Sequence, residues 1–175
     1  MAKMKRRILI VDGYNMIAYW QETKHFFKTN QLEEARDLLL KKLSHYAGFE
    51  ELEIICVFDA QYVPGVRQVY DHYQLQVVFT EEGETADAYI ERLAGQFNRL
   101  TTRVSVATSD LNEQWLIFSQ GALRVSAREL EKDVNQLRKD VASFKKDLDL
   151  TKPPLRPWNA DQLDQLQDML DELGK

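Results

Sequence analysis

Short apolar runs that alternate with segments of helical character constrain the fold of this chain more than any other feature. The runs cover residues 8–11, 52–58, 75–79 and 104–107, with a weaker one at 123–125. Mostly apolar runs of this length are typical of strands that are buried on both faces of a parallel sheet. Between them, apolar residues recur at helical spacing in segments 32–46, 86–97 and 115–118. The alternation predicts an α/β fold with a central parallel sheet covered by helices on both faces.

The last third of the chain has a different character. A length of 175 residues suits one domain of ordinary size with a short appendage. After Ser126, apolar residues alternate spacings of four and three, which predicts one long amphipathic helix with an apolar seam formed by Leu130, Val134, Leu137, Val141, Phe144 and Leu148. The sequence therefore predicts a domain over residues 1–135 and a helical extension over 136–175. The favoured interpretation is that the seam packs on its own domain, and the alternative is contact with a second copy or a partner.

The tail also contains a helix break. Prolines within segment 152–157 end the long helix, and Asn159 is a candidate N-cap for a last amphipathic helix. This final helix either docks on the domain or stays loosely attached.

Composition excludes several classes of protein. The single cysteine, Cys56, lies inside an apolar run, so one chain has neither a disulfide framework nor a thiolate metal site. No run approaches the length of a membrane span, and the basic start is followed by too few apolar residues for a signal peptide. We therefore expect a cytoplasmic protein without a membrane partner. A net charge of -5 argues against a binder that neutralises phosphates over its whole surface, but it is compatible with carboxylates that hold cations.

Four aspartates occupy positions that a parallel sheet would bring together. Asp12, Asp59 and Asp110 each come at the end of an apolar run, and Asp87 lies near the start of a predicted helix. Ligands of open parallel sheets bind beyond the carboxyl ends of the strands. Grouped carboxylates repel one another unless a cation neutralises them, and Mg²⁺ or Mn²⁺ prefers oxygen ligands. The pattern predicts a metal site with these four aspartates as catalytic and metal-binding residues for phosphodiester hydrolysis. Each aspartate taken alone has a plainer role as a helix cap or turn residue.

Polar residues beside these aspartates suit a cleft for nucleic acid. Asn15 is a candidate for orienting Asp12, and Thr108 and Ser109 are candidates for holding a water or a phosphate oxygen. Tyr14 either stacks on a base or packs in the core, and the sequence leaves both roles open. Basic residues in predicted loops are candidates for phosphate contacts, although such residues are usually only solvated: Arg67, Lys24, His25 and Lys28.

The run Val11-Asp12-Gly13-Tyr14-Asn15 resembles the opening motif of NYN domains, a branch of the PIN-like nucleases. The segments around Asp59, Asp87 and Asp110 follow in the same order, and 121–130 strengthens the similarity to the YacP-like bacterial group over residues 7–135. The resemblance implies a three-layer PIN-like (Rossmann-like) fold and a Mg²⁺- or Mn²⁺-dependent endoribonuclease. It also implies association with the ribosome and cleavage of translated mRNA. Asp12 and Asp87 would be the primary catalytic carboxylates, completed by Asp59 and Asp110.

Other functions leave different traces in a sequence. Gly13 and its neighbours do not form a dinucleotide-binding glycine motif, and no Walker phosphate loop is present, so we expect no small-molecule organic cofactor. An aspartyl-phosphate enzyme would have an aspartate where Tyr14 stands. The main alternative is a non-catalytic RNA- or ribosome-binding module with a PIN-like fold, and a third possibility is a nuclease that acts on DNA or on flap structures.

Overall fold

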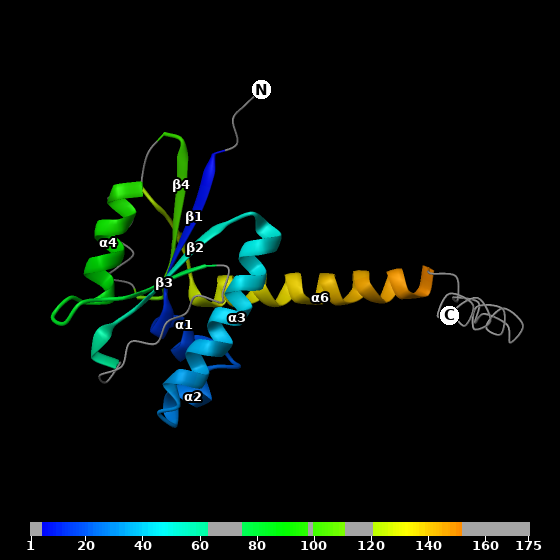
Figure 1. Cartoon of the computed structure of the whole chain (residues 1–175), viewed down its shortest axis with the longest axis horizontal. Helices are drawn as coiled ribbons and strands as arrows, with labels where there is room; N and C mark the ends of the chain where they lie inside the picture. The colour runs from blue at the N-terminus through cyan, green and yellow to red at the C-terminus, as the bar shows by residue number, and fades with distance from the viewer. Residues whose placement is uncertain (1–4, 63–74, 98–99, 111–120, 152–175) are drawn as a thin grey trace, which may run out of the picture. The chain divides into compact units, whose positions relative to one another are not determined.

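The computed structural model describes residues 5–62, 75–97, 100–110 and 121–151 (Figure 1). Within them, five strands form one sheet in the order β3-β2-β1-β4-β5. Every pairing in this sheet is parallel. The predicted α/β fold with a central parallel sheet is confirmed. The strands are β1 (Arg6–Asp12), β2 (Glu53–Phe58), β3 (Gln76–Phe79), β4 (Thr102–Ala107) and β5 (Leu123–Val125).

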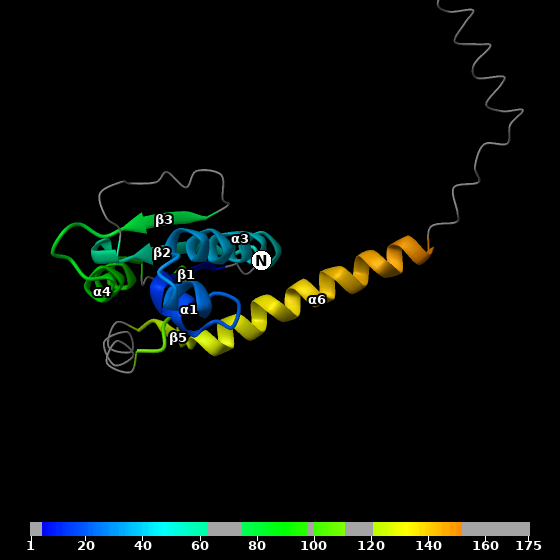
Figure 2. The same cartoon turned by 90° about the horizontal axis from the view of Figure 1, so that it is seen from below.

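Helices cover both faces of this sheet, which explains why the buried part of β1 carries apolar side chains on both faces. Leu9 and Val11 of β1 join a core shared with α1 (Gly13–Tyr19), α3 (Leu32–Glu50) and the start of α6 (Ala127–Thr151). Ile8 and Ile10 join a second core with α4 (Ala86–Phe97) on the opposite face. Because successive side chains of a strand point to opposite faces, both sets must be apolar. Figures 1 and 2 show α4 and α3 on opposite sides of the sheet.

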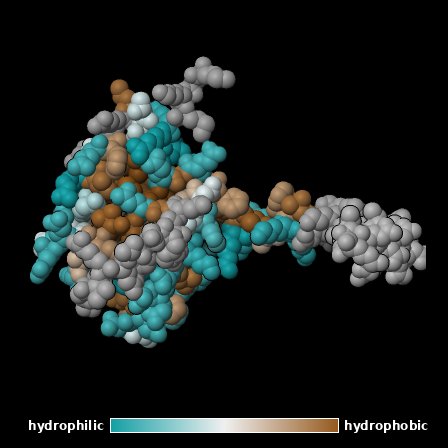
Figure 3. Space-filling model, in the orientation of Figure 1, coloured by the Kyte–Doolittle hydropathy of each residue, from teal (hydrophilic) through white to brown (hydrophobic). Residues whose placement is uncertain are grey.

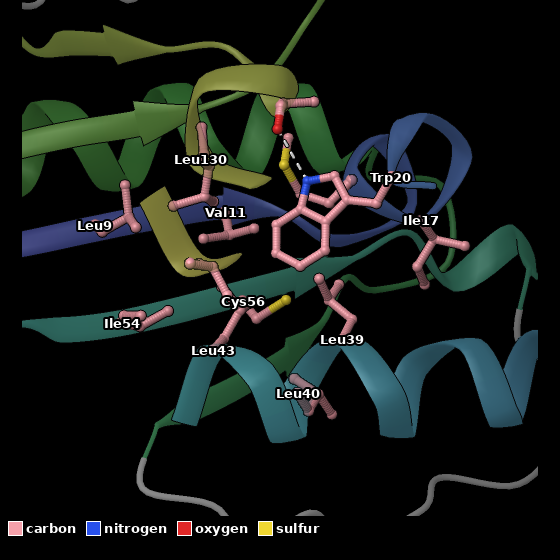
Figure 4. Packing of buried hydrophobic residues seen from close by; sticks show 14 of the residues in the cluster. Leu9, Val11, Ile17, Trp20, Leu39, Leu40, Leu43, Ile54, Cys56 and Leu130 are labelled. Carbon is pink, nitrogen blue, oxygen red and sulfur yellow. Dashed lines mark hydrogen bonds between the residues drawn. The ribbon is translucent and has the colours of Figure 1, made fainter. Parts of the chain in front are cut away.

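Trp20 connects the first turns of α6 to the core (Figure 4). Its side chain is 1% exposed, and its indole Nε1 donates a hydrogen bond of 2.9 Å to the carbonyl oxygen of Ala127. Leu130 and Val134 are buried in the same cluster. Nearby, Lys42 is almost buried and binds Asn135 Oδ1 of α6 at 3.1 Å. The favoured interpretation, in which the apolar seam packs on its own domain, therefore holds for these first turns.

The chain divides into two compact units, residues 1–137 and 138–175. The described part of the second unit is the remainder of α6. There Phe144 is 64% exposed and Leu148 is 46% exposed, and Figure 3 shows hydrophobic side chains at the surface of this helix. The predicted helices at 115–118 and after Asn159 lie outside the described residues.

Two short helices were not expected from the sequence. We expected a turn after Asp12 and a loop carrying Lys24, His25 and Lys28. Instead, α1 begins at Gly13, and α2 (Lys24–Lys28) contains all three basic residues. The loop expectation is wrong because short helices have too few turns to establish a periodic pattern. Packing determines them instead: Met16 and Ile17 are buried in α1, and the phenylalanines of α2, Phe26 and Phe27, pack against the core.

The junction between β1 and α1 requires glycine. A Cβ atom at Gly13 would overlap the ring of Phe58, whose side chain is fully buried in β2. That ring is held between Tyr14 and Phe79, with centroid distances of 5.0 and 5.5 Å. Because Phe58 has little room to move, only hydrogen fits at position 13, directly after Asp12.

We therefore expect Gly13→Ala to lower the free energy of unfolding by about 1–3 kcal/mol, the usual cost of overpacking a core. Urea unfolding followed by circular dichroism measures this change. Gly95→Ala is the matched control, because Gly95 is exposed inside α4. Alanine is favoured over glycine in helices by about 0.5–1 kcal/mol, so the control should be at least as stable as the wild type. Equal stability of Gly13→Ala and the wild type would contradict the packing argument.

Candidate active site

The carboxyl ends of the central strands carry acidic side chains at one edge of the sheet. Asp12 is the last residue of β1, Asp59 directly follows β2, and Asp110 lies three residues beyond the end of β4. The register pairs Asp12 with Val57 and Val11 with Ala107, so these three strands end at the same level. Asp87 lies in the first turn of α4. The structure thus brings all four aspartates predicted from the sequence to one region.

Electrostatic effects show that these carboxylates are near neighbours. Burial raises the pKa of Asp12 from 3.8 to about 7, against the lowering effect of the Asn15 N–H, and the negative charges of Asp87, Asp110 and Asp59 raise it further. The pKa of Asp87 is also raised, first by burial and then by Asp110 and Asp59. No positively charged side chain of the described residues contributes to the change in pKa of Asp12 or of Asp87. The raised pKa of both groups is therefore due to burial and to their negative neighbours.

Local hydrogen bonds show which carboxylates also have capping roles. Asp12 is the N-cap of α1, since its Oδ1 accepts a bond of 3.3 Å from the Asn15 N–H. Asp59 Oδ2 accepts a bond of 3.4 Å from the Ala86 N–H at the start of α4. The plainer interpretation of these aspartates as cap or turn residues is therefore correct for both, and it does not remove them from the cluster.

Asp87 differs because another residue caps its helix. Thr85 Oγ1 accepts a hydrogen bond of 3.2 Å from the Ala88 N–H, as an N-cap side chain does. No described residue donates a hydrogen bond to the carboxylate of Asp87, an exposed residue at the edge. Its oxygens thus have lone pairs to offer to a cation.

Asn15 joins two of the strand ends. Its side-chain Oδ1 accepts a hydrogen bond of 2.8 Å from the Ser109 N–H, beside Asp110. Its backbone N–H, and not its side chain, contacts Asp12. The expected role in orienting Asp12 therefore takes a different form: Asn15 connects the β1 end, with Asp12, to the β4 end, with Asp110.

The hydroxyls of Thr108 and Ser109 bind backbone groups. Thr108 is fully buried, and its Oγ1 accepts a hydrogen bond of 3.1 Å from the Asp110 N–H. Ser109 Oγ accepts one of 3.0 Å from the Ala127 N–H at the start of α6. Both residues lie at the edge, as the sequence predicted, and both hydroxyls fix its backbone there.

Tyr14 is part of the core. Its side chain is 6% exposed, and its ring lies 4.8 Å from that of Tyr62. Its hydroxyl accepts a hydrogen bond of 2.9 Å from Arg36. Of the two roles left open by the sequence, core packing is the one that fits these contacts. Arg67, the predicted phosphate contact, lies outside the described residues.

The carboxylates form an oxygen-rich cluster and not a preformed coordination shell. In the described part of the chain, no three histidine, cysteine or acidic residues lie in an arrangement that would hold a metal ion as they stand. The donor chemistry nevertheless suits a hard divalent cation. Mg²⁺ usually keeps several waters and is bound by only one or two carboxylates together with substrate phosphate. The cluster consists of side chains of this type.

An open cavity lies beside Asp59. It has a volume of about 570 Å³ and is lined by residues of the β2 end and of the loop before α4: Asp59, Ala60, Gln61, Glu81, Glu82, Gly83, Glu84 and Thr85. Glu84 forms an ion pair of 2.7 Å with Arg92. The other acidic residues of the lining, Asp59, Glu81 and Glu82, nevertheless make this flank of the edge acidic.

The fold and the acidic edge define the class of protein. This is an α/β protein with a nuclease-like NYN domain, and NYN domains belong to the PIN-like nuclease superfamily. The model of the YacP-like NYN domain matches residues 9–171, so the chain belongs to this family. The match extends beyond residue 135, where the recognisable motifs end. No described helix has the length and apolar character needed to cross a membrane.

Known relatives agree with this assignment. The chain is 50% identical over 127 residues to the uncharacterized protein YacP of Bacillus subtilis strain 168, covering 73% of this chain and 74% of that protein. It is similar to the crystal structure of Rae1 (YacP) from Bacillus subtilis, with a TM-score of 0.74, 40% identity and coverage of 96% of this chain and 92% of that one. For the crystal structure of a tryptophan-to-leucine mutant of that protein, the TM-score is 0.73, the identity 42%, and the coverage 83% and 86%.

The raised pKa of Asp12 predicts a pH dependence of stability. Between pH 3.8 and about 7 the folded protein retains a proton that the unfolded chain has lost, so stability falls as pH rises through this window. Asp12→Asn keeps the capping oxygen and removes the titration. In EDTA, we expect the variant to be more stable than the wild type at pH 8, by an amount of the order of a few kcal/mol. Near pH 4 the difference should nearly disappear.

Thermal unfolding of both proteins from pH 4 to 8 measures this dependence. Comparing the two proteins cancels the contributions of groups that titrate in both. A difference that stays constant over the whole range would contradict the assignment to Asp12.

Proposed function

We propose that this protein is a metal-dependent endoribonuclease that cleaves mRNA in association with the ribosome. The observation that supports the proposal is the gathering of Asp12, Asp59, Asp87 and Asp110 at one edge of a YacP-like NYN domain, where burial and mutual repulsion raise the pKa of Asp12 to about 7. Four carboxylates repel a phosphodiester unless a cation stands between them. The site therefore suits a reaction that needs Mg²⁺ or Mn²⁺.

The chain contributes ligands and positioning. Asp12 and Asp87 are the proposed primary ligands, and Asp59 and Asp110 complete the site. A bound cation would supply an activated water and neutralise charge that develops on the phosphate oxygens. Asn15 fixes the β1 end against the β4 end, and the bond from the Ala86 N–H to Asp59 fixes the β2 end against α4. These contacts support the proposal because they connect the strand ends and the helix that carry the four aspartates.

The choice of RNA and of the ribosome as partners rests on family membership. NYN domains act on RNA, and the resemblance to the YacP-like group implies ribosome association and cleavage of translated mRNA. The competing function is a binding module that keeps the fold without turnover. The structure offers one observation in favour of the enzyme: the Asp87 carboxylate is not used as a helix cap, although it lies in the first turn of α4.

We expect Asp12→Asn and Asp87→Asn to reduce Mn²⁺-dependent cleavage of labelled mRNA by about 100-fold or more, because each removes a charge from the cation's ligands. Asp133→Asn is the matched control, since it removes one negative charge at an exposed position of α6. Mapping of RNA ends, with and without ribosomes and with EDTA in a parallel reaction, measures the effect. A labelled DNA of the same sequence tests for a DNA nuclease.

The binding module and the DNA nuclease predict different results in these assays. Wild-type protein that binds RNA or ribosomes but cleaves no RNA with either cation would identify the binding module. Faster cleavage of DNA than of RNA would identify the DNA nuclease. Full activity of both aspartate variants would place the chemistry elsewhere in the molecule.

Cation binding should also be visible without any substrate. A ligand that binds only the folded state at 100 times its dissociation constant stabilises a protein by about 2.7 kcal/mol. We expect MnCl₂ to raise the melting temperature of the wild type and of Asp133→Asn at pH 7.5, and to have a much smaller effect on Asp87→Asn. An equal rise in all three proteins would mean that the cation binds outside the cluster.

A further inference from the structure

Thr80 lies at the carboxyl end of β3, next to Asp59 at the end of β2. The two strands pair in parallel with Phe58 opposite Phe79, so the residues that follow them, Asp59 and Thr80, occupy neighbouring positions (Figure 2). The Thr80 side chain is only 3% exposed. A hydroxyl that is buried to this extent normally takes part in a hydrogen bond. The partner of this hydroxyl therefore indicates why a polar residue stands here.

Two hydrogen bonds of Thr80 lie on either side of Asp59 along the chain. The Thr80 N–H donates one of 3.0 Å to the carbonyl oxygen of Phe58, which precedes Asp59. The Thr80 Oγ1 accepts one of 3.0 Å from the N–H of Ala60, which follows Asp59. Any residue except proline can make the first bond, whereas the second needs a side-chain oxygen. A single residue therefore restrains the backbone before and after Asp59, and one of the two restraints depends on its hydroxyl.

The place of the Asp59 carboxylate depends on the same turn. The chain enters a short 3-10 helix directly after Asp59. Asp59 Oδ1 accepts a hydrogen bond of 3.0 Å from the Gln61 N–H, and Oδ2 accepts one of 3.4 Å from the Ala86 N–H at the start of α4. Without the Thr80 hydroxyl, the Ala60 N–H would need another acceptor, and an aspartate that begins a helical turn is the usual one. The hydroxyl thus leaves the Asp59 carboxylate to its contact with α4.

The same arrangement occurs at the end of β4. Thr108 is fully buried, and its Oγ1 accepts a hydrogen bond of 3.1 Å from the Asp110 N–H. At both strand ends, the oxygen of a buried threonine binds a backbone N–H at or directly after an aspartate of the cluster. The recurrence connects these two threonines with the carboxylates beside them.

Thr80 also connects the two sides of the open cavity at the end of β2. One side of this cavity is formed by residues 59–61 and the other by residues 81–85. Thr80 directly precedes the second segment and binds the first through its hydroxyl. The second segment leads into α4, which carries Asp87 in its first turn. The Thr80 hydroxyl therefore links the backbone of one acidic strand end to the segment that leads to Asp87.

We propose that Thr80 is a positioning residue of the cation site, whose hydroxyl holds Asp59 where its carboxylate acts together with Asp87 on the cation. This inference rests on the proposed function, because it takes the carboxylate cluster as a cation site. Thr80 acts through the backbone, since its oxygen already accepts the hydrogen bond from the Ala60 N–H. Residues that orient metal ligands have measurable effects, and their substitution usually lowers metal affinity or activity by about 10–100-fold.

The test compares variants that differ by one hydroxyl. Thr80→Val replaces the hydroxyl by a methyl group, and Thr80→Ser keeps the hydroxyl. Thr23→Val is the matched control, because Thr23 is fully buried and its hydroxyl donates a hydrogen bond of 2.9 Å to the Ile17 carbonyl oxygen, between α1 and α2. Binding of MnCl₂ alone at pH 7.5 is measured by isothermal titration calorimetry, and thermal unfolding followed by circular dichroism measures the stability of each variant.

We expect Thr80→Val to bind Mn²⁺ about tenfold or more weakly than the wild type, because Asp59 loses its fixed place. Thr80→Ser should bind Mn²⁺ like the wild type, since the serine oxygen can accept the same hydrogen bond. Thr23→Val should lose thermal stability and keep its Mn²⁺ affinity. In cleavage assays, Thr80→Val should regain most of the wild-type rate at saturating Mn²⁺, because the variant retains all four aspartates.

Three results would overturn the inference: wild-type Mn²⁺ affinity of Thr80→Val, an equal loss of affinity in Thr23→Val, and an equal loss in Thr80→Ser. If Thr80→Val does not fold, the comparison of Thr80→Ala with Thr80→Ser carries the same expectations. The proposed nuclease function fails separately. Mn²⁺ binding that depends on Thr80, in a wild-type protein that cleaves no RNA, would support the positioning role and reject the enzyme. Mn²⁺-dependent cleavage by a protein whose Mn²⁺ affinity does not depend on Thr80 would do the reverse.

Discussion

Parallel pairing of β1 with both β2 and β4 is the constraint on which the rest of this structure depends. It places the ends of three strands at one level. The residues that follow these strands therefore lie close together even when their charges repel one another. The side chains that meet here are carboxylates, and their repulsion together with burial raises the pKa of Asp12 to about 7. The two buried cores on the faces of the sheet, built around residues such as Ile10 and Leu39, supply the stability that holds this unfavourable cluster together.

Hydrogen bonds from backbone N–H groups to side-chain oxygens connect the strand ends at this edge. The side chain of Asn15 accepts a hydrogen bond from the Ser109 N–H, and that of Asp59 accepts one from the Ala86 N–H. The Ser109 hydroxyl accepts one from the Ala127 N–H. Each bond joins two elements that are distant in sequence. A buried backbone N–H without a hydrogen-bond partner raises the free energy of the folded state. Each of these bonds therefore also fixes the position of the strand or helix end that it joins. Gly13 adds a steric constraint at the same place, since the Phe58 ring fills the space beside it.

The sequence predicted the sheet and the position of the aspartates because both depend on strong local patterns. Strands such as β1 are apolar on both faces, and a residue directly after such a strand must lie at the carboxyl edge. The roles of smaller residues depended on distant partners, which a single sequence does not contain. Nothing in the run around Asn15 indicates that its side chain bonds to Ser109, 94 residues away. Tyr14 was equally ambiguous, because its burial depends on Tyr62 and Arg36. The Ser126 to Glu129 capping box was readable from spacing alone and marks the start of α6.

The distribution of charge along the edge matters more than the net charge of the chain. A net charge of -5 suggests a protein that repels polyanions. This total, however, adds up charged side chains that lie in different places and have different roles. The aspartates of the cluster count as negative although a cation would reverse their local effect. The glutamates around the cavity repel phosphate on the flank beside Asp59. An acidic total is therefore consistent with a site that acts on RNA, because part of that total belongs to the carboxylates that would hold the cation.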